Sequence, residues 1–209
     1  MRPANPGRPL HPLPPPPGAG ACRRSTMRWP ADSPPTEDEL RRARRRPLFD
    51  EQALPLRTSL GRADIEGLLP HRGAFLLAGH IHALDLAGRL AGTQALRADD
   101  PVFADHFPGQ PVYPGVLLVE MAGQFALCLA ALQALGSARV PAGTRPQPVR
   151  LVRIHDTRFV APALPGDQLT VLAQTVDTGG YTFMALAQVL RGPAVLCLTL
   201  FEAMVGEPP

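Results

Sequence analysis

The chain has 209 residues, of which 45% are hydrophobic and 19% are charged, and its formal net charge is +3 at pH 7. This length allows one domain with a buried core that also carries a terminal extension. The positive charge does not indicate nucleic-acid binding, because residues 1–60 hold 11 Arg against 6 acidic residues, whereas residues 61–209 hold 10 Arg against 12.

Residues 1–60 are predicted to be a largely disordered N-terminal extension. The segment contains "LPPPP" and "RRARRR", and 13 of the 26 prolines lie within the first 55 residues. A segment with so much Pro and Arg cannot bury enough apolar surface to offset its ordering entropy. Three interpretations stay open: the extension binds an acidic partner or tethers the domain, it has no function, or translation starts at Met27.

The cysteines and the N-terminal sequence favour a cytoplasmic protein. Cys22, Cys128 and Cys197 are scattered without a CxxC spacing, which indicates buried thiols in a reducing compartment rather than disulfides or a zinc site. The N-terminus also lacks the apolar stretch of a secretory signal.

Residues 61–209 are predicted to form one α+β domain that is rich in strands. It begins with a short helix, Ala63–Leu69, which ends before Pro70 because proline disfavours the helical conformation in the residue before it. Strand-length segments follow at 75–84, 89–96, 149–160, 167–178, 181–190 and 194–205. The sequence "DTGG" at 177–180 predicts a hairpin between two antiparallel strands.

The one long helical segment is Val116–Leu135, with Pro114 and Gly115 before it and Gly136 as a predicted C-cap. It is apolar nearly all round, which is typical of a buried core helix or of a membrane span. We favour burial, because Glu120 would be costly in lipid and the strands need a central element. The predicted fold is an antiparallel sheet around this helix, and the edges of such a sheet can pair with a second copy.

Two polar side chains on the long helix are candidates for chemistry. Glu120 and Gln124 are four residues apart, so they share one face of the helix. A carboxylate on a buried helix must be paired, hydrogen-bonded or protonated, and in the protonated form it can act as a general acid. The alternative is a structural role, in which Glu120 only holds a loop.

The loop before the helix supplies two further candidates. In "DHFPGQPVYPGVLLVE", residues 105–120, His106 precedes a turn at 107–109, and an imidazole can accept a proton near neutral pH. A single loop histidine is usually without function. However, Gly115 opens the helix, where free backbone amides can stabilise an oxyanion. A base, an acid and these amides are the groups needed for one type of reaction. In it, a proton is removed from the carbon beside a carbonyl and a β-hydroxyl group is lost.

The other histidines of the domain are weaker candidates. His71 is predicted to order the first loop, and His80, His82 and His155 are interpreted as surface or packing residues of strands. Their spacing does not indicate a zinc site, and the sequence contains neither a Gly-rich phosphate loop nor a GxSxG motif.

These motifs resemble the hotdog-fold (3R)-3-hydroxyacyl-[acyl carrier protein] dehydratases of the FabZ type. The stretch "HFPGQPVYPGVLLVE" matches that family's HFPGxPxxPGVLxxE signature at every fixed position. Three more stretches resemble family segments in the same order: "IEGLLPHRGAFLL", "EMAGQ" and "RFVAPALPGDQL". The resemblance covers residues 63–205 and implies a hotdog fold, in which the sheet wraps a long central helix.

The resemblance also implies roles for individual residues. His106 would take the α-proton, Glu120 would protonate or hold the leaving hydroxyl, and the Gly115 amide would polarise the thioester carbonyl. Residues expected to support the site or to contact the carrier protein are Gln124, Pro114, Phe107, Arg158 and Arg153. In that family the His and Glu of one site come from different protomers. The resemblance therefore implies a dimer or a trimer of dimers, an acyl carrier protein as partner, and chemistry without a cofactor or a metal.

Departures from the family pattern affect the expected partner more than the catalytic pair. The family's "DKARFRR" is here "HDTRFVA", residues 155–161, which keeps Arg158 but loses basic neighbours that would attract an acidic carrier protein. This favours a specialised dehydratase of a secondary pathway. Two alternatives stay open, a hotdog thioesterase or isomerase and a non-catalytic acyl-binding scaffold, although the intact His106 and Glu120 count against a scaffold.

Overall fold

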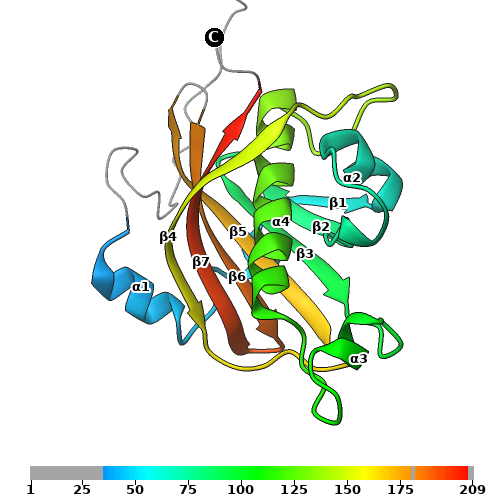
Figure 1. Cartoon of the computed structure of the whole chain (residues 1–209). Coiled ribbons are helices and arrows are strands. Elements are labelled where there is room, and N and C mark those ends of the chain that lie inside the picture. The colour runs from blue at the N-terminus through cyan, green and yellow to red at the C-terminus, as the bar shows by residue number, and fades with distance from the viewer. Residues whose placement is uncertain (1–34, 180–181, 207–209) are drawn as a thin grey trace, which may run out of the picture.

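The computed structural model describes residues 35–179 and 182–206. A seven-stranded sheet carries one long helix, α4, across one of its faces (Figure 1). The elements in chain order are α1 (Glu37–Ala43), η1 (Glu51–Ala53), β1 (Leu56–Leu60), α2 (Arg62–Leu68), η2 (Gly73–Phe75), β2 (His80–Asp85), β3 (Arg89–Ala95), α3 (Val102–Asp105), α4 (Gly115–Leu135), β4 (Val149–Phe159), β5 (Gln168–Gly179), β6 (Thr182–Arg191) and β7 (Ala194–Val205).

The strands lie in the order β1-β2-β3-β5-β6-β7-β4, and each neighbouring pair is antiparallel. The predicted pairing of the strands on either side of "DTGG" is confirmed by β5 and β6, although part of the turn itself lies outside the described residues. In the chain, α4 connects β3 to β4, and β4 lies at the edge of the sheet beyond β7. The helix therefore spans the face of the sheet.

Helix α4 is the centre of the core, as the sequence predicted. It packs against β3, β5, β6 and β7, and Met121, Phe125, Leu129 and Leu132 are fully buried. Gly136 has a φ of 61° and caps the C-terminus in the left-handed conformation that glycine adopts without strain. By length and hydropathy alone α4 could also cross a membrane, but its apolar surface is used here to pack against the sheet.

The central strands of the sheet are buried on both faces. Along β6, residues 183, 185, 187 and 189 face the α4 core, whereas Leu186 and Leu190 belong to two clusters on the opposite face. This separation follows from the alternation of side chains along a strand. The opposite face is covered by residues 36–55, which we call the N-terminal strap.

Apolar and polar contacts together fix the strap. Leu40 of α1 and Leu54 after η1 are buried against the sheet. Gln188 of β6 is fully buried beneath the strap; its Oε1 accepts a hydrogen bond from the Leu48 N–H at 2.8 Å. Its Nε2 donates to two strap carbonyls, those of residues 43 and 46. One side chain thus replaces three hydrogen bonds that the strap backbone would otherwise make with water.

The prediction of disorder for residues 1–60 is wrong for residues 35–60. These residues form α1, η1 and β1, and β1 pairs with β2. Helix α1 begins with a capping box between Thr36 and Glu39, and Arg44 of the arginine run pairs with Asp156 at 3.2 Å. These contacts offset the ordering entropy that the composition alone could not. Residues 1–34, including Cys22, lie outside the described residues.

Most other predicted elements are confirmed with small shifts at their ends. The exception is the strand predicted from residue 75, because β2 begins only at His80. The N–H groups of Leu77 and Ala78 donate to the Gln124 side chain of α4 instead of to a neighbouring strand. Cys128 and Cys197 are buried free thiols, as predicted.

Candidate active site

The start of α4 presents free backbone amides. The Pro114 carbonyl accepts the third and fourth amides of the helix, whereas those of Gly115 and Val116 have no backbone acceptor among the described residues. No side chain within the described part of the chain caps this end. A Cβ at position 115 would lie 2.8 Å from the ring of the exposed Phe159, so a side chain there would force this ring or the helix start to move. The absence of a Cβ lets Phe159 approach these amides closely.

His106 follows α3 and has a defined ring orientation. Its Nδ1 lies 2.9 Å from the carbonyl oxygen of Val112. A carbonyl can only accept, so Nδ1 carries the hydrogen, and in the neutral ring Nε2 keeps a free lone pair. The Val112 N–H donates back to the His106 carbonyl at 2.9 Å, and the Phe107 ring stacks on the imidazole with centroids 4.0 Å apart. The loop thus holds His106 with Nε2 available as a base.

His106 and the start of α4 line one groove of about 520 Å³. The other walls are Val112, Tyr113 and residues 159–163, which begin at the last residue of β4. Burial, with a smaller contribution from Asp100, raises the pKa of Tyr113 to about 12, so this phenol stays neutral near pH 7. Among the side chains that line the groove, His106 is therefore the one suited to accept a proton at neutral pH.

Glu120 lies further along α4 and is held by Gln124. The Gln124 Nε2 donates to Glu120 Oε1 at 2.8 Å and to the Phe75 carbonyl at 2.8 Å. The Gln124 Oε1 accepts the N–H groups of Leu77, at 2.7 Å, and Ala78, at 3.1 Å. Gln124 is fully buried, whereas the Glu120 side chain keeps 32% of its surface exposed. The carboxylate is therefore oriented by a rigid amide and still open on one side.

A second side chain reaches Glu120, and the sequence analysis missed it. His71 Nε2 lies 3.4 Å from Glu120 Oε1, so His71 does more than order the first loop. Because the two residues are far apart in the sequence, no spacing rule could have paired them. The other three histidines within the described residues, His80, His82 and His155, lie in strands, as predicted, and contact Ser59, Glu51 and Glu202.

The single chain does not bring His106 and Glu120 into one cavity among its described residues. Glu120 is absent from the lining of the groove that holds His106, and its polar contacts are Gln124 and His71. The two arginines predicted to contact a carrier protein also differ from each other. Arg158 pairs with Asp156 at 2.8 Å, whereas Arg153 lies exposed on β4 opposite Glu202 of β7.

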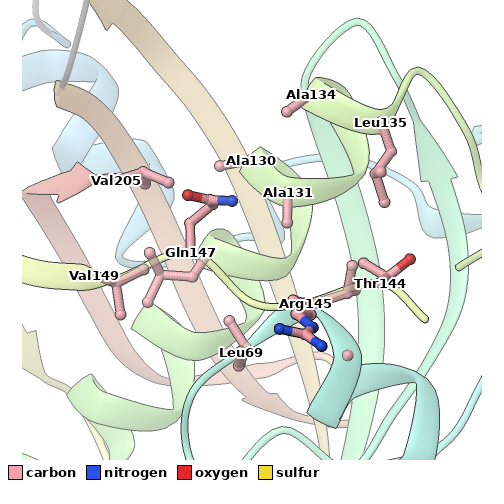
Figure 2. A pocket seen from close by; sticks show the side chains of 13 residues that line it. Leu69, Ala130, Ala131, Ala134, Leu135, Thr144, Arg145, Gln147, Val149 and Val205 are labelled. Carbon is pink, nitrogen blue, oxygen red and sulfur yellow. The ribbon is translucent and has the colours of Figure 1, made fainter. Parts of the chain in front are cut away.

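A second pocket, of about 190 Å³, lies at the C-terminal half of α4. Figure 2 shows its lining, with Leu69 from the end of α2, Ala131 and Leu135 from α4, and Val205 from β7. Arg145, in the connection after α4, is the one charged residue in this lining. The pocket contains none of the predicted catalytic side chains, so the candidate site remains at the N-terminal half of α4.

Comparisons with known proteins match the part of the chain that contains the candidate site. The family model of the FabA-like domain matches residues 69–192. A protein from Verminephrobacter eiseniae, named 3-hydroxyacyl-[acyl-carrier-protein] dehydratase FabZ, is 40% identical over 146 residues, which are 67% of this chain and 92% of the relative. The FabZ of Symbiobacterium thermophilum is 30% identical over 146 residues, or 68% of this chain and 97% of the relative. This chain belongs to the FabZ dehydratase family.

Solved structures agree with the fold of this FabZ-family chain. A chain of the dehydratase heterocomplex ApeI:P from Xenorhabdus doucetiae superposes with a TM-score of 0.56 at 12% identity, covering 68% of this chain and 91% of the other. Cj0977, a virulence protein from Campylobacter jejuni, gives a TM-score of 0.51 at 14% identity, with 70% and 98% covered. At such identities the likeness shows the fold alone, and that fold is the predicted hotdog. The N-terminal strap lies outside the residues that the family model matches.

Proposed function

We propose that this FabZ-family enzyme removes water from (3R)-3-hydroxyacyl thioesters of acyl carrier protein and forms trans-2-enoyl thioesters, with His106 as base and Glu120 as acid. The observation that carries the proposal is the Val112 carbonyl at His106 Nδ1, which holds the hydrogen of the neutral ring on Nδ1 and leaves the Nε2 lone pair free. The same groove contains the free amides at the start of α4. The FabZ relatives are named 3-hydroxyacyl-[acyl-carrier-protein] dehydratases, which supports the substrate class.

The reaction consists of two coupled proton transfers. His106 Nε2 takes a proton from C2 of the acyl chain, while the amides of Gly115 and Val116 hydrogen-bond the thioester oxygen, on which negative charge develops. The C3–O bond breaks as Glu120 gives its proton to the leaving hydroxyl, which departs as water, and the electron pair forms the C2=C3 double bond. Return of the proton from His106 to Glu120 restores the enzyme, so these steps need no cofactor.

We propose that two chains pair along β4, so that each site combines His106 of one protomer with Glu120 of the other. β4 is an 11-residue edge strand on which Leu151, Val152 and Ile154 are exposed. A long apolar edge is a template for pairing with another chain. Phe159, at the end of β4, also lines the His106 groove and is 56% exposed, so a chain added along this edge would close the groove.

We propose that the carrier protein approaches the exposed basic side chains of β4 in the cytoplasm. Arg153 is the better contact, because its guanidinium has no ion-pair partner among the described residues. Arg158 is held by Asp156, which also pairs with Arg44 of α1. An acidic carrier protein would therefore compete with Asp156 for Arg158, but not for Arg153.

The direct test is to incubate the purified protein with a (3R)-3-hydroxyacyl carrier-protein thioester and to follow the loss of one water by mass spectrometry. The wild type is expected to form the enoyl thioester, and His106→Ala and Glu120→Gln are each expected to be slower by about 100-fold or more. His80→Ala, which removes a histidine that contacts only Ser59 among polar partners in the described chain, is the control. Release of free acid would instead favour a thioesterase. Water loss that neither substitution slows would overturn the assigned roles.

A further inference from the structure

His71 is the only histidine whose ring contacts a candidate catalytic group among the described residues. It lies in the loop after α2, its side chain is 17% exposed, and Nε2 is 3.4 Å from Glu120 Oε1. The other ring nitrogen, Nδ1, is buried and has no hydrogen-bond partner within residues 35–179 and 182–206. One face of the ring stacks on Phe75, with centroids 6.3 Å apart. The imidazole is therefore enclosed on most sides and points one nitrogen at Glu120.

The buried Nδ1 determines where the ring hydrogen lies. An imidazolium would bury a bare N–H and a charge, and a neutral ring with its hydrogen on Nδ1 would turn the Nε2 lone pair towards a carboxylate oxygen. A bare buried donor is costly, and two facing lone pairs repel each other. The neutral ring with its hydrogen on Nε2 avoids both problems, and this nitrogen lies 3.4 Å from Glu120 Oε1, a contact longer than a typical hydrogen bond.

Gln124 and His71 both contact the same carboxylate oxygen of Glu120, Oε1. Gln124 Nε2 lies 2.8 Å from Oε1 and His71 Nε2 lies 3.4 Å from Oε1, while no hydrogen bond from the described residues reaches Oε2. An acid proton on Oε1 would face two N–H groups. It is therefore more stable on Oε2, the oxygen that the protein leaves free for a substrate.

We propose that His71 is a positioning residue for Glu120: together with Gln124 it holds Oε1, so that the acid proton is carried on Oε2 towards the leaving hydroxyl. The inference rests on the proposed function, because it assumes that Glu120 is the acid. Once the proton has been transferred, the two N–H groups also stabilise the carboxylate that remains. His71 thus acts on the reaction through Glu120 and does not touch the substrate.

The charged groups of the surrounding segment are engaged elsewhere. The Arg72 guanidinium donates to the carbonyls of Leu69, His71 and Glu66, at 2.6, 2.7 and 2.9 Å. The Arg62 side chain bonds the Glu66 carboxylate at 3.1 Å and the carbonyl of residue 73 at 2.7 Å. None of these groups forms an ion pair with Glu120 in the described chain, so a pH effect of changing His71 would report on the contact between His71 and Glu120.

The test compares His71→Ala and His71→Gln in the full-length protein, with His80→Ala as the control. His71→Ala is expected to lower kcat by about tenfold with little change in KM. It should also move the alkaline limb of the kcat profile to higher pH, because it removes an N–H that stabilises the ionised acid. His71→Gln, whose amide can place an N–H near the position of Nε2, is expected to recover part of kcat. Thermal unfolding of each variant checks that the fold is intact.

A double-mutant cycle separates positioning from a general structural role. If His71 acts through Glu120, His71→Ala costs little further activity in the Glu120→Gln background. An equal loss in both backgrounds, or a His71→Ala enzyme with wild-type kcat and pH profile, would overturn this inference and leave the proposed function intact. Wild-type turnover by Glu120→Gln alone would overturn the role of Glu120 as acid and this inference with it, whereas no water loss by the wild type would overturn the proposed function itself.

Discussion

Glycine at position 115 allows the Phe159 ring to lie close to the start of α4. A Cβ there would meet the Phe159 ring at 2.8 Å, so an alanine must displace either the ring or the first turn of α4. Gly115→Ala is therefore expected to lower kcat by about tenfold, because the Gly115 and Val116 amides would shift away from the proposed position of the thioester oxygen. Steady-state kinetics would measure the effect.

The same helix offers a matched control for this substitution. A Cβ at Gly123 would meet only the edge of Phe201, at 4.0 Å, so Gly123→Ala has room. It is expected to keep kcat and to stabilise the helix by up to about 1 kcal/mol. Equal losses of activity in the two alanine variants would contradict the importance of the contact with Phe159.

The buried cysteines give a prediction about chemical reactivity. Burial raises the pKa of Cys197 to about 12 and that of Cys128 well above its usual value. The reactive thiolate is then almost absent at pH 8, so both thiols should resist iodoacetamide in the folded protein and react after unfolding. Labelling a Cys22→Ser variant, analysed by mass spectrometry, counts these two thiols alone. Rapid labelling of the folded variant would contradict the assigned burial.

The residues of the candidate site were predictable to different degrees. His106, Gly115 and Glu120 lie in one short motif, so their candidate roles and their link to the long helix could be proposed from the sequence. Helix geometry predicted that Gln124 shares a face with Glu120, but its hydrogen bonds to the backbone of residues 75, 77 and 78 could not be predicted from the sequence. The contact between His71 and Glu120 depends on how the loop after α2 packs on α4, and that tertiary contact has no local signature.

Among the elements, the strap shows how a polar contact can order a segment of unfavourable composition. Gln188→Leu would leave one N–H and two carbonyls of the strap without their partner. We expect it to lower the free energy of unfolding by about 3 kcal/mol, at about 1 kcal/mol for each lost hydrogen bond. Urea unfolding followed by circular dichroism would measure this change.

A second buried glutamine provides the control for this experiment. Gln174 of β5 is 8% exposed, and its side chain makes no hydrogen bond with the described residues. Gln174→Leu should therefore change stability much less than Gln188→Leu. If both variants lost the same stability, the loss would come from placing leucine in the sheet, not from releasing the strap.

The sequence predicted the sheet and the central helix but not the second cover of the sheet. The runs "FMALAQVL" and "AVLCLTLF" are apolar on both strand faces, which indicates burial on both sides, and α4 can cover only one. The capping box in "TEDE", residues 36–39, was the local signal for α1. The prediction of disorder rested on the Pro and Arg content of the segment, and composition does not report a contact such as that of Gln188.

At the scale of the whole molecule, the account depends on a dimer formed along β4. Leu151 is 59% exposed in the single chain, so Leu151→Lys should leave the fold intact while placing a charge in the proposed interface. We expect this variant to sediment as a monomer and to lose dehydratase activity, because each site needs two chains. Analytical ultracentrifugation and the activity assay test this together. Leu135→Lys, at an exposed position at the end of α4, is the control and should remain dimeric.

Complementation between two inactive variants tests the central claim most directly. His106→Ala and Glu120→Gln, carrying different tags, would be co-expressed, and the mixed dimers would be isolated and assayed for water loss from a (3R)-3-hydroxyacyl thioester. In a mixed dimer, one site carries both substitutions and the other keeps His106 and Glu120 intact. The account predicts about half of the wild-type activity in the mixed dimer and almost none in either parent. Mixed dimers that are as inactive as their parents would contradict a dehydratase site shared between two chains.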